Sequence, residues 1–189
     1  SSSQATREAV FRVIAHEVAH QWFGDLVTMA WWDNLWLNEG FASWMATKAS
    51  DVLNPDWALW DRASEAREAA LGLDARKTTH PIQQPILNES QANDAFDTIS
   101  YQKGQGFLRM LEAYLGKDAF RDGLRRYMAK HQYSNTTTAD LWAALGEASG
   151  KPVVELAANW TEQPGFPVVK VSAVDGGRTL RLEQSRFTV

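Results

Sequence analysis

The residues best suited to chemistry lie in the stretch HEVAHQWFGD, which covers residues 16 to 25. His16 and His20 are four positions apart, so on a helix both imidazoles leave one face, about 40° apart around the axis. Two neutral imidazoles at this spacing can bind one zinc ion. Glu17 lies at the edge of the same face, where its carboxylate can take a proton from a metal-bound water without being a ligand. The pattern therefore predicts a zinc site with a general base beside it.

A catalytic zinc site uses three protein ligands and one open position, so the chain must supply a third donor. The chain has no cysteine, and His80 and His131 are isolated and far along the sequence. Glu39, in LWLNEGFASW, is the best candidate, because the intervening loop lets its helix pack against the first one. The alternatives are a hydrogen-bonded pair of core histidines and, for Glu39 alone, an ordinary surface or capping acid. We expect His16, His20 and Glu39 to bind the metal together.

The elements that must position these residues are mainly helices. Apolar spacing and capping signals predict helices at about 6–23, with Thr6 as the N-cap, and at 37–51, 55–71, 98–115, 117–131, 138–149 and 152–160. Residues 72–93 read as a long loop of the kind that often carries function. We expect the first helix to bury a broad apolar face, formed by Val10, Val13, Ile14, Ala15 and Val18.

The pattern changes after GFP at residues 165 to 167. VVKVSAV and TLRLEQSRF alternate like two strands, and DGG between them indicates a tight turn. A lone hairpin is marginally stable in water. We therefore interpret residues 166–189 as the truncated start of a β-domain.

Composition excludes several classes of function. The 189 residues carry a net charge of −4 with no concentrated basic stretch, so we expect no nucleic-acid partner. The absence of cysteine excludes disulfides and thiolate metal sites. No run approaches the roughly 18 apolar residues of a membrane span. A cytoplasmic location is favoured, because cysteines and a signal peptide are both absent, although neither observation excludes the periplasm or secretion.

Four stretches together resemble the gluzincin zinc aminopeptidases, the family of aminopeptidase N and puromycin-sensitive aminopeptidase. HEVAHQWFGD resembles the family's HExxH-x-W-F-G signature, with Asp25 where asparagine is common. A metzincin is excluded, because QWFGDL follows His20 in place of His-x-x-Gly-x-x-His. WWDNLWLNEGFASW places eighteen residues between His20 and Glu39, which is the family spacing. FDTISYQKGQGFLRML resembles the helix of the catalytic tyrosine, and WTEQPGFPVVKV the end of the catalytic domain.

The resemblance implies a fold that is mainly α. Residues 1–165 would be the helical zinc-binding part of a thermolysin-like catalytic domain, incomplete at its N-terminus, and residues 166–189 the start of a β-sandwich. His16, His20 and Glu39 would bind one Zn²⁺. Glu17 would act as general base and then pass the proton to the leaving amine. Tyr101 would donate its phenolic hydrogen to the developing oxyanion; by itself it would read as a buried helix tyrosine with a structural hydrogen bond.

Four other residues carry weaker expectations. Asp25 and Asp33 are able to orient a zinc-binding histidine through its second nitrogen, although exposed or capping roles are equally consistent with their positions. His80 and His131 are expected on the surface.

The function implied is removal of N-terminal residues from peptides by water activated at zinc. The family anchors the free amine of the substrate with an upstream Gly-x-Met-Glu-Asn motif, which this chain lacks. We therefore expect the parent protein to be a zinc aminopeptidase, and the chain by itself to bind zinc with little activity. The implied partners are peptides with a free N-terminus and the missing upstream and downstream domains. Two alternatives stay open: a bifunctional relative that also hydrolyses a lipid epoxide, and a non-catalytic zinc-binding or scaffold module.

Overall fold

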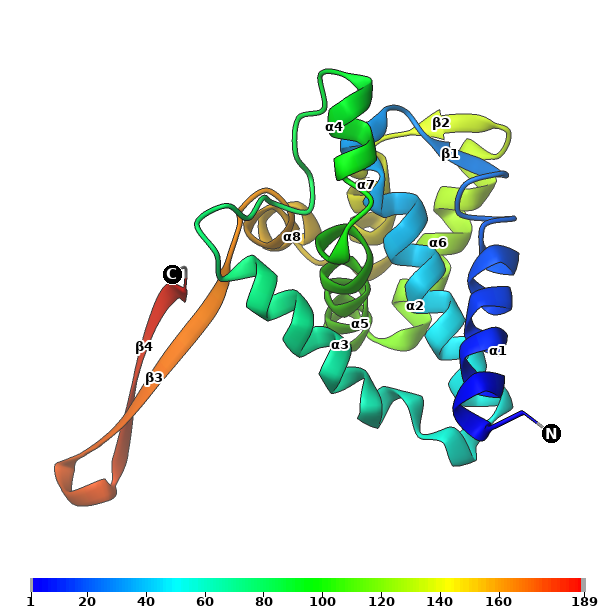
Figure 1. Ribbon diagram of the computed structural model, residues 1–189. Coiled ribbons are helices and arrows are strands. Elements are labelled where there is room, and N and C mark those ends of the chain that lie inside the picture. Colours follow the sequence, from blue (N-terminus) through cyan, green and yellow to red (C-terminus); the bar gives the residue numbers. More distant parts are fainter. Residues whose placement is uncertain (1, 188–189) are drawn as a thin grey trace.

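In this computed structural model the chain is described over residues 2–187, apart from the side chains of residues 63–65. Over that range it forms eight α-helices and two small sheets (Figure 1). None of these helices combines the length and apolar character needed to cross a membrane. The elements in chain order are α1 (Gln4–Ala19), β1 (Val27–Met29), the 3-10 turn η1 (Trp32–Asn34), α2 (Trp36–Leu53), the 3-10 turn η2 (Pro55–Trp57), α3 (Leu59–Asp74), α4 (Glu89–Asp94), the π-helical turn η3 (Ile99–Lys103), α5 (Gly104–Leu115), α6 (Lys117–His131), β2 (Ser134–Thr136), α7 (Thr138–Ser149), α8 (Val153–Thr161), β3 (Phe166–Val174), the 3-10 turn η4 (Asp175–Gly177) and β4 (Thr179–Phe187).

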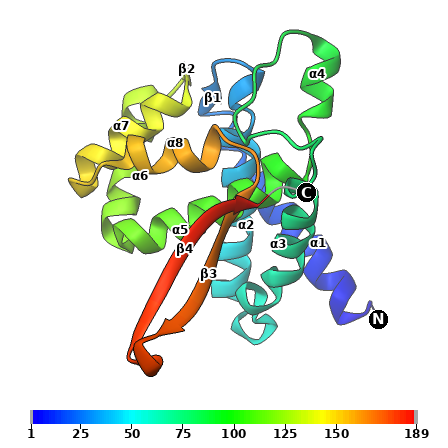
Figure 2. The same ribbon diagram turned by 90° about the vertical axis from the view of Figure 1, so that its left-hand side faces the viewer.

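The prediction of a mainly α fold is confirmed. Helix α2 is the central element, because α1, α3 and α5 all pack against it. Helix α6 packs against α5 and α7, and α8 packs against α7 (Figures 1 and 2). Each fully buried large side chain contributes about 1.5–3 kcal/mol by leaving water. Several of these come from the facing sides of three helices: Trp36 and Phe41 of α2, Leu108 and Leu111 of α5, and Leu141 and Leu145 of α7.

Helices α2 and α5 meet backbone to backbone at two glycines. A Cβ built on Gly104 would lie 3.3 Å from the Cα of Gly40, and one on Gly40 would lie 3.3 Å from the carbonyl oxygen of Ser100. The helices approach this closely because neither glycine has a side chain. The contact brings Glu39, which precedes Gly40, close to η3, which precedes Gly104.

The predictions for α1 need two corrections. The helix begins at Gln4, because the hydroxyl of Ser3, not that of Thr6, accepts the capping hydrogen bond, and it ends at Ala19 with His20 as the C-cap instead of at Phe23. Its apolar face is also not buried: Val10, Val13, Ile14 and Val18 are 51–61% exposed. The face that packs against α2 carries small and polar residues instead, and Ala19 and Glu8 are the buried ones.

Other helix boundaries follow the predictions with local differences. The capping box of Thr137 and Asp140 is confirmed at the start of α7. Pro55 opens the short turn η2, and α3 starts only after Ala58, which has a left-handed backbone with φ of 46°. The long loop predicted at 72–93 is shortened at both ends, because α3 continues to Asp74 and α4 forms at Glu89–Asp94. The helix predicted at 98–115 is divided into η3 and α5.

The C-terminal strands form the predicted hairpin. β3 and β4 pair antiparallel from Phe166 opposite Phe187 to Val174 opposite Thr179. Gly176 and Gly177 have φ of 68° and 88°, values that favour glycine, so DGG supplies the turn. The hairpin extends away from the helical body (Figures 1 and 2), and its apolar residues Val171 and Leu182 are 57% and 65% exposed. Its assignment to a β-sandwich stays a prediction.

Candidate metal centre

The structure brings His16, His20 and Glu39 together between α1 and α2. The Nε2 atoms of the two histidines are 3.1 Å apart, and the Oε2 atom of Glu39 lies 3.2 Å from His16 Nε2 and 3.5 Å from His20 Nε2. The helical spacing of four residues presents both rings to the same side, and the packing of α2 on α1 adds the carboxylate. These are the ligands that the sequence predicts.

The three donor atoms fit a zinc ion. Ligand atoms about 2.1 Å from a tetrahedral zinc ion are separated from each other by about 3.4 Å. The three observed separations of 3.1, 3.2 and 3.5 Å lie close to that value. Two imidazoles and a carboxylate are also a ligand set that zinc accepts in enzymes, with a fourth position left open.

The charges of the site show how strongly these groups interact. The hydrogen bond to Glu39 raises the pKa of His20 to about 8, against the opposing effect of burial. Burial by itself would raise the pKa of Glu39, but hydrogen bonds from His16 and His20 lower it to about 2. Glu39 is therefore a carboxylate at neutral pH, the form that binds a metal.

The second nitrogen of each histidine contacts a group outside the ligand set. The Nδ1 atom of His20 lies 2.9 Å from the carbonyl oxygen of Phe23, so the neutral ring would carry its hydrogen on Nδ1 and offer the Nε2 lone pair to a metal. The Nδ1 atom of His16 lies 3.5 Å from the hydroxyl of Ser43. Asp25 and Asp33 do not orient the histidines: Asp25 accepts from Gln21, and Asp33 accepts from Asn34. The sequence offers no signal for Phe23 or Ser43, because a backbone carbonyl and a serine have no characteristic spacing.

Glu17 lies on α1 between the two histidines, and its side chain is exposed. Its negative charge contributes to raising the pKa of both His20 and Tyr101, which places it in the electrostatic surroundings of both groups. This is the position that a general base needs, because it is beside the ligands without being one of them.

Tyr101 joins the site from η3. Its ring stacks on the imidazole of His16 with a centroid separation of 5.9 Å and an interplanar angle of 17°. Burial and the negative charge of Glu39, to which its hydroxyl hydrogen-bonds, raise its pKa well above the ordinary value. Tyr101 is therefore a neutral hydrogen-bond donor at physiological pH, as a group that stabilises an oxyanion must be.

The expectation that His80 and His131 lie on the surface holds only in part. Each is partly buried. His80 pairs with Asp97, its Nε2 atom 2.7 Å from Oδ2 of the carboxylate, and His131 packs on the ring of Tyr127. The pairing of His80 with Asp97 has no spacing signal, whereas Tyr127 and His131 are four positions apart on α6, a spacing at which helical side chains meet.

Comparison with known proteins identifies the family of the chain. The family model described as "Peptidase family M1 domain" matches residues 1–160. The chain is 49% identical over 183 residues to "Aminopeptidase 2" of Candida albicans, covering 96% of this chain and 20% of that protein. It is 47% identical over 186 residues to "Aminopeptidase M1" of Arabidopsis thaliana, covering 98% of this chain and 21% of that protein. It is also 47% identical over 188 residues to "Probable aminopeptidase 2" of Sulfurisphaera tokodaii, covering 99% and 24%. The chain thus spans about a fifth to a quarter of the length of these relatives. Because this family model matches most of its residues, the chain belongs to peptidase family M1.

Proposed function

We propose that this chain supplies the zinc-binding and catalytic residues of an aminopeptidase that removes N-terminal residues from peptides. The observation that carries the proposal is the convergence of three donor atoms at separations that suit a zinc ion, with Glu17 and Tyr101 beside them. The names of the relatives, which are aminopeptidases, support the reaction class.

His16, His20 and Glu39 would hold the ion. Zinc bound there supplies a Lewis acid that lowers the pKa of a water molecule and polarises a carbonyl group. Glu17 takes the proton of the attacking water and later delivers it to the leaving amine, a role open to an exposed carboxylate beside the ligands. Tyr101 donates its hydroxyl hydrogen to the carbonyl oxygen as that oxygen becomes negative.

Zinc binding is tested on the chain itself by metal analysis after dialysis and by calorimetric titration. We expect one zinc ion per chain, lost in the variant His16→Ala and retained in the matched variant His131→Ala, which removes a histidine outside the ligand set. Equal zinc content in the two variants would refute the site.

Turnover is tested on the full-length polypeptide in which the chain occurs, with an aminoacyl-arylamide as substrate. Loss of a general base costs about 10²- to 10⁴-fold in rate, so Glu17→Gln should keep its zinc while kcat falls by that factor. Unchanged turnover would remove Glu17 as the base. Absence of turnover in the unaltered, zinc-loaded polypeptide would favour the alternative of a non-catalytic zinc-binding module.

A further inference from the structure

The turn that carries Tyr101 is organised by Asp97. The Tyr101 amide donates to the Asp97 carbonyl oxygen at 3.1 Å. The Oδ1 atom of the Asp97 carboxylate accepts the amides of Ile99 and Ser100 at 3.0 and 3.1 Å. Asp97 therefore fixes the start of the π-helical turn η3, a rare conformation that is frequent at functional sites.

The other oxygen of the Asp97 carboxylate is held by His80. His80 Nε2 lies 2.7 Å from Asp97 Oδ2, and His80 Nδ1 lies 2.7 Å from the carbonyl oxygen of Pro81. A carboxylate and a carbonyl only accept hydrogen bonds, so both ring nitrogens face acceptors, an arrangement that favours the imidazolium form of His80. Burial opposes this charge, as does Lys103, but the pairing with Asp97 raises the pKa of His80 overall.

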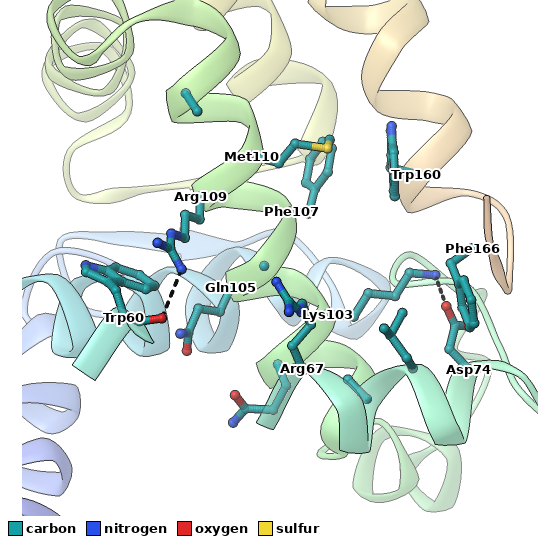
Figure 3. Close-up of a pocket in the computed structure, with 15 residues that line it drawn as sticks. Trp60, Arg67, Asp74, Lys103, Gln105, Phe107, Arg109, Met110, Trp160 and Phe166 are labelled. Atoms are coloured by element: carbon teal, nitrogen blue, oxygen red, sulfur yellow. Dashed lines mark hydrogen bonds and ion pairs between the residues drawn. The ribbon is translucent and has the colours of Figure 1, made fainter. Parts of the chain in front are cut away.

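A second ion pair holds the other end of η3. Lys103, the last residue of the turn, places its ammonium 2.8 Å from Asp74 Oδ2 (Figure 3). It also donates to the carbonyl oxygens of Gln163 and Gly165. All three ammonium hydrogens thus have acceptors. Asp74 is 1% exposed, and its Oδ1 accepts from the Thr79 hydroxyl and the Gly165 amide.

Both anchors belong to one segment, because Asp74 ends α3 and His80 follows in the loop after it. We propose that residues 74–80, here called the strap, position Tyr101 by ion-pairing with both ends of its turn. The inference rests on the proposed role of Tyr101 as the oxyanion donor. His80 and Asp74 contact η3 and its flank and not the ligand atoms, so they act as positioning residues through Tyr101.

A strap that only stabilises the fold would look the same in the structure, so the experiment must separate the two roles. A double-mutant cycle does this in the zinc-loaded full-length polypeptide. Tyr101→Phe removes the donor hydroxyl and is expected to lower kcat about 10²-fold. His80→Gln keeps a hydrogen-bonding side chain but loses the charge, and we expect kcat to fall about tenfold through misplacement of the hydroxyl, with KM within twofold.

In the Tyr101→Phe background the same His80→Gln change should have no further effect, because no hydroxyl remains to be misplaced. The matched control His131→Gln, also at a partly buried histidine, should leave kcat unchanged in both backgrounds. Equal losses from His80→Gln in both backgrounds would show a merely structural role and overturn the proposal, as would no loss in either.

A spectroscopic readout does not depend on activity. In the chain labelled with ¹³C-tyrosine, the Tyr101 ring signal, assigned by its loss in Tyr101→Phe, senses the imidazole of His16 stacked upon it. His80→Gln and Lys103→Met should shift this signal, and Lys103→Arg should restore most of its position. An unchanged signal in the first two variants overturns the strap. Shifted signals with no turnover in the unaltered protein would support the strap and refute the proposed function.

Discussion

The glycine contact between α2 and α5 gives a prediction whose magnitude follows from the structure. In Gly40→Ala the new Cβ would lie 3.3 Å from the Ser100 carbonyl oxygen and 3.4 Å from the Gly104 Cα. Both are backbone atoms, so they cannot yield by rotating a side chain, and the helices must separate. Overpacking of this kind costs about 1–3 kcal/mol, whereas replacing a helical glycine by alanine contributes about 0.5–1 kcal/mol of stabilisation.

A matched control isolates the crowding. Gly106 lies on α5, and a Cβ there meets nothing within 4 Å. Gly106→Ala should therefore raise the free energy of unfolding by about 0.5–1 kcal/mol. Because the helix-propensity gain is common to both variants, Gly40→Ala should be less stable than Gly106→Ala by about 1–3 kcal/mol, the crowding cost by itself.

The assay is urea unfolding followed by circular dichroism, with a chelator present so that metal binding does not contribute. Zinc titration of the same variants gives a second readout. Glu39 directly precedes Gly40, so displacement of α2 should weaken zinc binding about tenfold in Gly40→Ala, a typical cost of disturbing the support of a ligand. Equal stability of the two alanine variants, or a more stable Gly40→Ala, would refute the close backbone contact as the reason for this glycine.

Three further predictions concern stability. Asn34 is buried, and its side-chain oxygen accepts hydrogen bonds from both the amide and the hydroxyl of Thr138, at 2.8 and 2.7 Å. Asn34→Ala should therefore lower the free energy of unfolding in urea by about 1–3 kcal/mol. Asn34→Asp keeps the acceptor and should lower it by less. Burial by itself would raise the pKa of Asp140, but hydrogen bonds from Thr137 lower this pKa below its ordinary value. The ionised carboxylate therefore stabilises the fold above the unfolded-state pKa of about 3.9, and this stabilisation is lost as the pH falls through the folded-state pKa. Asp140→Ala should cost about 1 kcal/mol at pH 7 and less at pH 2, and an equal cost at both would contradict the linkage. Zinc at 100 times its Kd should stabilise the chain by about 2.7 kcal/mol, measured as a rise in Tm that a chelator reverses and His16→Ala abolishes.

The sequence predicts the metal ligands because they lie within short, recognisable stretches of the chain. His16 and His20 share one helix face at a fixed spacing, and Glu39 follows in a recognisable stretch. Only the family resemblance predicts a role for Tyr101, since nothing in its neighbours indicates that it stacks on His16, 85 positions earlier by their residue numbers. The side-chain contacts that support the site, such as the hydroxyl of Ser43 beside His16, were not predictable from spacing at all.

The ion pairs of the strap were equally impossible to predict from the sequence. The sequence identifies a long loop after α3 as a segment of interest, but the partners of the strap, Asp97 and Lys103, lie just before η3 and at its end, beyond α4. His80 and Asp97 are 17 positions apart, and an ion pair formed across a fold imposes no period on the sequence. The π-helical turn is equally hard to predict, because the residues of Ile99–Lys103 carry no pattern that separates a π-helical turn from the start of an α-helix.

The reversed orientation of α1 follows from the chemistry it carries. A pattern of aliphatic residues normally indicates the buried side of a helix, yet Val10, Val13 and Ile14 are each more than half exposed. The side that packs on α2 must present His16 and His20 to Glu39, so it is not aliphatic throughout. Alanines near the ligands, such as the buried Ala19, let α2 approach closely enough to complete the set. Sequence patterns and structure therefore disagree where the metal centre dictates which residues face inward, as expected for a functional site.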